Sequence, residues 1–262
     1  MTRPVFLGED LSPDPGSVGV GDRATLAGAE GRHAASVRRI GAGEWVDVVD
    51  GVGLRLTCEV VGTDKSSLSL VVREVIQEGP PVPEIVLVQA LAKGGRDEAA
   101  VEICTEIGID RVIPWASQRA IVQWKGPKAE KGRAKWEGVA RAAAKQSRRA
   151  FVPTVEGVMD SRELTSWVVS LTDEAGVAFV CHEEASESLG AALASLQEAR
   201  ADASLPPRVA LIVGPEGGIG PEETGALVDA GAKTIGLGAH VLRSSTAGAV
   251  ALTLIRAAAG AY

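Results

Sequence analysis

The hydrophobic and polar positions change their pattern once along the chain, near residue 80. Before this point, short segments alternate apolar and polar residues, as in residues 44–50 (EWVDVVD), 54–62 (LRLTCEVVG) and 68–76 (LSLVVREVI). Alternation with a period of two predicts half-buried strands, and the glycines between these segments predict turns. We therefore expect antiparallel β structure in the first part of the chain.

Beyond residue 83, continuous apolar segments alternate with helix-like ones. Strands are predicted at residues 84–91 (EIVLVQAL), 177–183 (VAFVCHE) and 208–213 (RVALIV), with a helix-like segment, ESLGAALASLQEAR, between the last two. This alternation predicts a mostly parallel α/β sheet. Between the two patterns, residues 77–83 (QEGPPVP) hold three prolines and a glycine, which is typical of a linker. We expect two domains, residues 1–77 and 78–262.

Composition is typical of a packed protein and excludes several classes. The chain has 262 residues, of which 45% are hydrophobic and 23% charged, enough to form sizeable cores. No segment reaches the roughly 18 consecutive apolar residues of a membrane span, and the first residues lack a basic-then-apolar signal. We expect a cytoplasmic protein that does not enter a membrane.

The three cysteines, Cys58, Cys104 and Cys181, are scattered and odd in number. This spacing argues against a disulfide framework and against a zinc site, so no metal is expected. Cys181 precedes His182, a pair that could suggest a thiol nucleophile. Adjacent residues on a strand point to opposite faces, however, and we favour a structural cysteine with His182 near the ligand.

A glycine-rich, acidic loop follows the predicted strand 208–213. Residues 214–223 read GPEGGIGPEE, and glycines at this position let the backbone approach a ligand closely. Their order matches neither the G-x-G-x-x-G of dinucleotide folds nor the phosphate-binding loop with its lysine. Glu216 would also repel a phosphate. The loop favours a cationic ligand without phosphate, such as S-adenosylmethionine with its sulfonium; an ordinary α/β turn is the alternative.

A second loop of this kind follows residues 233–237 (KTIGL), which form the next predicted strand. Residues 237–252 read LGAHVLRSSTAGAVAL, and a helix of small residues is expected to start near Ser245 or Thr246. Two neighbouring strand–loop–helix units are predicted to form one cofactor pocket. The helix is apolar nearly all round, so it must be covered on several sides, either within one subunit or by a second copy.

Positive charge is concentrated in one segment although the net charge is −7. Between Arg119 and Arg149 there are ten Lys or Arg residues and two acids. Arg141, Lys145 and either Arg148 or Arg149 recur on one side of a predicted helix. A smaller basic cluster consists of Arg32, His33, Arg38 and Arg39. Such a field steers a polyanion to one face, which predicts RNA contact rather than only a solvated helix surface.

Several motifs together resemble one known family. The two loops, with residues 91–115 (LAKGGRDEAAVEICTEIGIDRVIPW), 117–124 (SQRAIVQW) and 143–153 (AAKQSRRAFVP), are similar to the bacterial 16S ribosomal RNA uridine N3-methyltransferases of the SPOUT superfamily. Residues 32–39 (RHAASVRR) and 47–51 (DVVDG) resemble the amino-terminal domain of that family. The resemblance implies a small PUA-like β-barrel domain, followed by an α/β domain with a SPOUT-type mostly parallel sheet and a carboxy-terminal trefoil knot.

The resemblance also implies an activity and its residues. The family is a group of homodimeric enzymes that use S-adenosylmethionine to methylate N3 of a uridine in 16S ribosomal RNA of the small subunit. Arg243 and Glu216 are the implied catalytic residues. The implied cofactor-binding residues are His182, Gly214, Pro215, Glu216, Gly217, Gly218, Leu237, Gly238, Val241, Leu242, Arg243, Thr246 and Ala247. The implied RNA-binding residues are Arg32, Arg38, Arg39, Lys93, Arg96, Arg119, Arg141, Lys145, Gln146 and Arg149.

Two departures from the family pattern keep rival functions open. His240 stands where the family commonly has an arginine, and Ser245 stands where it has a glutamate. A noncatalytic RNA-binding or ribosome-assembly factor of the same fold is therefore one alternative. Ribose 2′-O methylation of RNA is another, because SPOUT relatives perform both reactions. A nucleotide-dependent enzyme of Rossmann type is disfavoured by the glycine order and by Glu216.

Overall fold

The computed structural model describes residues 3–261, which divide into two compact units. The first unit combines the chain up to Pro80 with Ala144–Val152, and the second combines Pro81–Ala143 with Pro153–Tyr262. The sequence placed one boundary after residue 77 and assigned residues 144–152 to the second domain. In the structure this segment belongs to the first unit because Ala150 is buried beside Val5, Leu7 and Val49.

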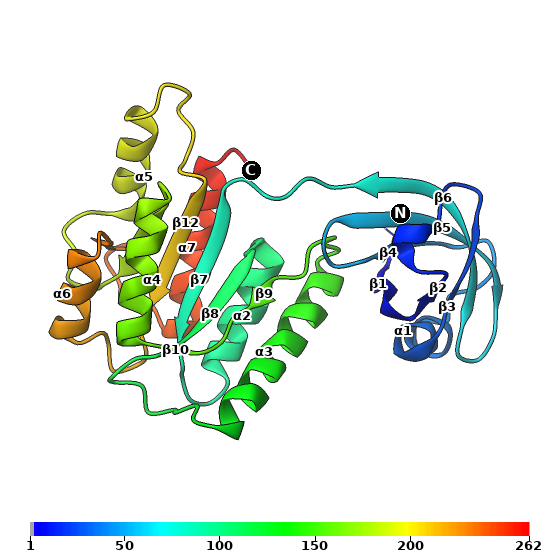
Figure 1. The fold of residues 1–262 in the computed structure, drawn as a ribbon, viewed down its shortest axis with the longest axis horizontal. Helices are drawn as coiled ribbons and strands as arrows, with labels where there is room; N and C mark the ends of the chain where they lie inside the picture. The colour runs from blue at the N-terminus through cyan, green and yellow to red at the C-terminus, as the bar shows by residue number, and fades with distance from the viewer. Residues whose placement is uncertain (1–2, 262) are drawn as a thin grey trace. The chain divides into compact units, whose positions relative to one another are not determined.

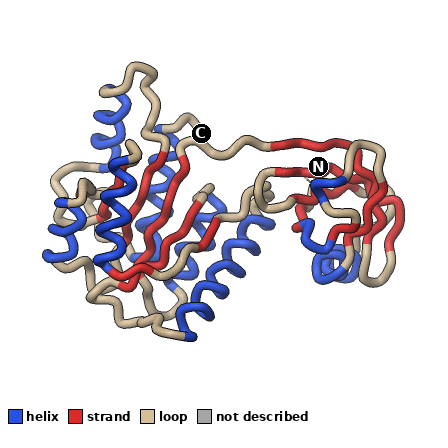
Figure 2. Tube along the Cα trace, viewed as in Figure 1, coloured by secondary structure: helices blue, strands red, loops and turns tan. Residues whose placement is uncertain are grey.

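The first unit is a curled, mostly antiparallel sheet with strand order β1-β4-β5-β6-β3-β2. Only the β1–β4 pairing is parallel, and β1 and β2 are the edges, so the sheet forms a half-barrel that is not closed. The predicted segments 44–50, 54–62 and 68–76 become β4, β5 and β6 (Figure 2). The strands are β1 (Val5–Leu7), β2 (Leu11–Ser12), β3 (Arg23–Leu26), β4 (Trp45–Val49), β5 (Leu54–Thr63) and β6 (Leu68–Gln77).

Alternating residues of these strands form the core of the first unit. On β5, Leu56, Cys58 and Val60 are fully buried, and on β6 Leu68 and Leu70 face the same core. Helix α1 (Gly28–Arg32) continues into one π-helical turn (His33–Val37), and two 3-10 turns (Gly8–Asp10 and Pro15–Ser17) connect the first strands. Period-two burial of this kind fixes the register, since a one-residue slip would expose the apolar set.

The second unit is a parallel sheet with helices on both faces (Figure 1). The strand order is β10-β8-β7-β12-β11-β13, and β9 pairs with β8 ahead of β10. The strands are β7 (Glu84–Ala90), β8 (Arg111–Ala116), β9 (Thr154–Val155), β10 (Met159–Asp160), β11 (Val177–Cys181), β12 (Arg208–Val213) and β13 (Lys233–Ile235). The helices are α2 (Arg96–Ile107), α3 (Pro127–Gln146), α4 (Ser161–Asp173), α5 (Leu189–Glu198), α6 (Pro221–Asp229) and α7 (Ser244–Ala258).

Neighbouring residues of each strand pack into separate hydrophobic cores on the two faces of this sheet. Leu87 of β7 contributes to the core shared with α2, α5 and α7, whereas Val88 contributes to the core shared with α4 and α6. Strands buried on both faces read as continuous apolar segments, which is why the sequence predicted parallel strands here. The predicted mostly parallel α/β domain is confirmed.

Helix α7 returns from the edge of the sheet to its centre. It follows edge strand β13 but packs against α2, α5, β12 and β7. Its small residues permit this close approach: a Cβ atom on Gly248 would lie 3.0 Å from Leu87 Cδ1 and 3.3 Å from Cys104 Sγ. Near the end of the helix, Arg256 forms an ion pair with Asp110, with 3.0 Å between Nη2 and Oδ2. This return packs the last helix against the central strands of the sheet.

Candidate active site

Loops that follow β12, β11 and β13 surround a cavity of about 1080 Å³ in the second unit. Ligands of open α/β sheets bind at the carboxyl ends of the strands, because the connecting loops converge there. The cavity is large enough for a nucleoside-sized ligand. Within residues 3–261, no group of three or more His, Cys, Asp or Glu residues is placed to hold a metal ion.

The structure brings together almost all the residues that were predicted to bind a cofactor. The cavity is lined by His182, Gly214, Pro215, Glu216, Gly217, Gly218, Leu237, Gly238, Val241, Leu242, Arg243 and Ala247. Thr246 is not among the lining residues. It is exposed in the first turn of α7, where its backbone N–H donates to Arg243 O at 2.8 Å.

The glycine-rich loop after β12 is held tightly. A Cβ atom on Gly214 would lie 2.6 Å from the Cγ1 atom of the buried Ile219, so no larger residue fits without a shift. Gly218 has φ +72°, in the left-handed region that favours glycine. Arg119 Nη1 donates to Gly217 O at 3.2 Å. Arg119, which was predicted to bind RNA, therefore lies against this loop and holds it from the β8 side.

Glu216 is fixed by two partners from the neighbouring loop. Its Oε1 atom accepts from Arg96 Nη1 at 2.9 Å and from the backbone N–H of Lys93 at 3.3 Å. Partial burial acts to raise the pKa of Glu216, but backbone hydrogen bonds and the Arg96 guanidinium outweigh burial and hold the pKa below its usual range. Glu216 is therefore an ionised carboxylate at neutral pH, with a low tendency to accept a proton.

Arg243 is placed differently. Its carbonyl oxygen accepts from the backbone N–H groups of Thr246 and Ala247 and so begins α7, while its side chain is exposed and lines the cavity. Among the described residues its guanidinium has no hydrogen-bond or ion-pair partner. Beside it, the side chain of Val241 is 76% exposed. Both residues are available to an incoming molecule.

Two hydroxyl groups of the cavity lining lack a partner in the part of the chain that the structure describes. Thr224 Oγ1 and Ser244 Oγ are buried, and neither forms a hydrogen bond. Buried polar atoms are nearly always hydrogen-bonded, so these two atoms point to a ligand with complementary polar groups. No sequence pattern marks these two hydroxyls, because Ser and Thr near a helix start are also ordinary capping residues.

His182 lines the cavity, and its hydrogen bonds stabilise the loop after β11. Its backbone N–H donates to Ile235 O at 3.0 Å, and its Nδ1 atom accepts from the backbone N–H of Glu184 at 3.2 Å. Burial raises the pKa of the neighbouring Cys181 thiol to about 12. A thiol that remains protonated at neutral pH is a poor nucleophile, in agreement with the structural interpretation of Cys181.

Glu223, which was not predicted as a site residue, joins three elements beneath the glycine-rich loop. Its side chain is buried and accepts from the backbone N–H of Gln118 at 2.8 Å and from the Ser161 hydroxyl. Trp115 Nε1 in turn donates to Ser161 Oγ at 3.1 Å. The end of β8, the start of α4 and the start of α6 are thus fixed to one carboxylate.

The residues predicted to bind RNA fall into two groups, one in each unit. In the first unit Arg32, Arg38, Arg39 and Gln146 are exposed, Arg149 is half-buried, and Lys145 forms an ion pair with Glu30 at 2.5 Å. In the second unit Arg96 and Arg119 line the cavity, Lys93 lies in the adjoining loop, and Arg141 is half-buried on α3.

Comparison with known families defines the class of protein. Residues 78–256 match the family model described as an RNA methyltransferase domain, and residues 26–73 match the model described as an RNA methyltransferase PUA domain. The fold and the cavity are therefore those of an RNA methyltransferase. The chain belongs to the ribosomal RNA small subunit methyltransferase E family, as the following relatives show.

The relatives match both units. The enzyme of that name from Mycobacterium tuberculosis is 41% identical over 243 residues, which cover 93% of this chain and 87% of the relative. The one from Bacillus subtilis is 30% identical over 238 residues, 88% of each chain. The structure of the Neisseria gonorrhoeae enzyme bound to S-adenosyl methionine has the same fold, with a TM-score of 0.79, 22% identity and 98% coverage of both chains.

Proposed function

We propose that this protein methylates N3 of a uridine in 16S ribosomal RNA of the small subunit, with S-adenosylmethionine as the methyl donor. The observation that carries the proposal is the cavity formed by the two loops after β12 and β13, which unites the motif residues of an RNA methyltransferase. A ribosomal RNA substrate implies that the protein works in the cytoplasm.

The residues around the cavity fit this donor. Gly214 lets the glycine-rich loop pack closely on Ile219 beside the cavity, and the hydroxyls of Thr224 and Ser244, which lack a partner among the described residues, suit the polar substituents of an adenosyl group. Three carboxylates, Glu183, Glu184 and Glu216, line the cavity beside three arginines, and these carboxylates offer partners for a sulfonium cation. When bound, S-adenosylmethionine supplies an electrophilic methyl group.

The protein residues have two tasks in this reaction. N3 lies on the pairing edge of uracil, so the base must be unpaired, and the developing anion must be stabilised. The free guanidinium of Arg243 is suited to bind the pyrimidine carbonyl groups and stabilise that anion. Glu216, ionised and held by Arg96, is assigned to positioning the glycine-rich loop and the donor rather than to removing the N3 proton.

Nucleoside mass spectrometry tests the proposal. Small ribosomal subunits from cells that lack this protein are incubated with the purified protein and S-adenosylmethionine, and their 16S ribosomal RNA is then digested. The expected product is 3-methyluridine at one position. A ribose 2′-O-methylated nucleoside would support the rival reaction, and no methylated product would support a noncatalytic RNA-binding factor.

The same proposal includes a homodimer. Helix α7 leaves part of its surface uncovered, including Thr253, Ala257 and Leu254, whose side chain is 39% exposed. Ile103 of α2, a helix that packs against α7, is 40% exposed. These exposed apolar side chains on two helices that pack together mark the surface that we assign to a second copy of the chain.

A further inference from the structure

We propose that four exposed lysines, Lys93, Lys125, Lys128 and Lys131, form a track for the RNA phosphate backbone that leads to the cavity. We call this set the lysine track. The inference rests on the proposed function, since it takes RNA as the substrate, and it adds the path by which the RNA approaches. Two observations support the inference. Some basic residues already form ion pairs within the protein, and the loops after β7, β8 and β12 lie at one edge of the sheet.

Some basic residues of segment 119–149 form ion pairs within the protein, whereas others have charges that are available to a ligand. Arg133 pairs with Glu130 and Glu137, and Lys135 pairs with Glu98 at 2.5 Å. By contrast, the four residues of the lysine track are exposed, and their ammonium groups have no partner among residues 3–261. Their charges are therefore available to an external anion, whereas those of Arg133 and Lys135 are compensated within the second unit.

Strand order places the lysine track beside the cavity. β8, β7 and β12 are neighbours in the sheet, so the segments that follow them are neighbours at its carboxyl edge. The segment after β8 leads through Lys125 into α3, the one after β7 carries Lys93, and the one after β12 is the glycine-rich loop. The loop that carries Lys93 and the segment that leads into α3 are thus neighbours at the edge of the sheet where the cavity lies.

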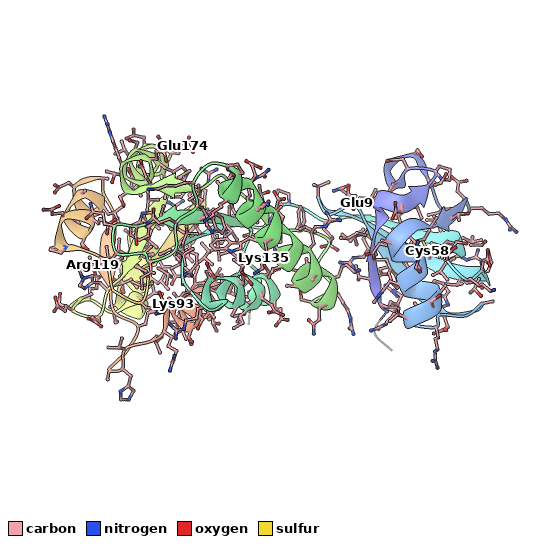
Figure 3. All side chains as sticks on the ribbon, turned by 90° about the horizontal axis from the view of Figure 1, so that it is seen from below. Glu9, Cys58, Lys93, Arg119, Lys135 and Glu174 are labelled. Carbon is pink, nitrogen blue, oxygen red and sulfur yellow. The ribbon has the colours of Figure 1, made fainter. Side chains whose placement is uncertain are left out.

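Two contacts hold this order. The backbone N–H of Lys93 donates to Glu216, which lines the cavity, and Lys135 of α3 pairs with Glu98 in the first turn of α2. Lys128, Lys131 and Lys135 recur at i, i+3 and i+7, so Lys128 and Lys131 share the helix side that faces α2. Figure 3, seen from below Figure 1, labels Lys93 and Lys135 in this part of the second unit.

Phosphate is the group that such a track recognises. Lysine ammonium groups contact phosphate oxygens as point charges, and the amino end of α3 adds a partial positive charge. Contacts of this kind position an RNA strand without reading its sequence. The lysine track would therefore supply affinity and direction, while the cavity supplies the choice of base. An acidic protein surface is the other anionic partner, and the following test excludes one of the two.

The experiment compares three forms of the full chain: wild type, a Lys128→Ala/Lys131→Ala double variant, and a control. The control, Arg200→Ala/Lys233→Ala, removes the same charge near the amino ends of β12 and β13, away from the cavity. The probe is a fluorescein-labelled RNA stem-loop of mixed sequence, whose binding is measured by anisotropy over a range of salt concentrations. Calorimetry with S-adenosylmethionine and a thermal melt confirm that each form is intact.

Weaker RNA binding is expected for the track variant alone. Its plot of log affinity against log salt should lose a slope of about 1 per lysine removed, or about 2 in total. The Lys93→Ala variant should lose a slope of about 1 in the same plot. The control should keep the wild-type slope, and S-adenosylmethionine should bind all forms equally.

Two outcomes would overturn the inference. If the track variant kept the wild-type slope, or lost no more than the control, RNA would not follow these lysines, and an acidic protein would become the better partner. The proposed function would then still stand on methyl transfer. If the wild type bound no RNA, both the lysine track and the proposed substrate would be wrong.

Discussion

Arg243 and Glu216 both line the cavity, but their surroundings assign them different work. Glu216 is held by Arg96 and by a backbone amide, with its pKa lowered, so its charge already has a structural use. Arg243 is exposed and has no side-chain partner in the described part of the chain. A cation without a partner among residues 3–261 is the better candidate for stabilising charge that develops only during the reaction.

Replacing Arg243 by alanine should abolish most of the methyl transfer and spare donor binding. Loss of one such stabilising group commonly lowers the turnover number by roughly 10²- to 10³-fold. Tritium transfer from labelled S-adenosylmethionine to small ribosomal subunits measures the first effect, and calorimetry measures the second. Equal losses of turnover and donor affinity would instead identify Arg243 as a donor-binding residue.

The three thiols should resist alkylation in the folded protein. Burial is the main cause that raises the pKa of Cys58, Cys104 and Cys181 to about 12 each, so only about one thiol in 10⁴ is ionised at pH 8. Mass spectrometry after iodoacetamide treatment at pH 8 should show unmodified protein, and rapid labelling in urea. Because folding raises these pKa values, the thiols should lower stability only above about pH 9, where the thiols of the unfolded chain ionise first. Labelling of Cys181 in the native state would contradict this account.

At the scale of elements, the site depends on the buried carboxylate of Glu223 as well as on the loops that line the cavity. Glu223 connects the amino end of α6 with the segment after β8 and, through Ser161, with α4. The segment after β8 also carries Arg119, which binds the glycine-rich loop. The position of that loop is therefore set by elements that follow three different strands.

Replacing Glu223 by alanine should lower the free energy of unfolding by about 2 kcal/mol, because it removes the buried carboxylate that accepts hydrogen bonds from the Gln118 N–H and the Ser161 hydroxyl. Urea denaturation measures this change. Glu222→Ala is the matched control, since Glu222 lies in the same helical turn but is exposed, and it should be nearly neutral. Similar losses in both variants would argue against Glu223 as an anchor.

Local pattern predicted the elements well because it reflects burial directly. The continuous apolar segments 84–91 and 208–213 indicated strands covered on both sides, and the two glycine-bearing loops after strands predicted most of the cavity lining. Thr246 was placed in the site because it stands in the motif, whereas only the chain path shows that it faces solvent. Glu223 and Lys93 acquire their roles from partners about 60 to 125 residues away, a separation that no local pattern encodes.

For the whole molecule, the exposed apolar surface of α2 and α7 predicts self-association. Light scattering after size-exclusion chromatography should give twice the mass of the 27.0 kDa chain. Leu254→Glu should shift the mass to that of one chain, since a charge would enter the covered face. Val169→Glu, on a partly exposed residue of α4, is the matched control and should leave the mass unchanged. A single-chain mass for the wild type would rule out the dimer.

The return of Ala144–Val152 to the first unit restricts how this molecule can be divided. Ala150 covers Val5, Leu7 and Val49, and Phe151 bridges to Gly51 and Val52. A gene fragment that stops after Pro80 would therefore encode a sheet with part of its apolar surface bare, prone to aggregate when expressed alone. Recombination at the proline-rich linker would likewise separate residues that fold together, so neither unit can be inherited as an uninterrupted module.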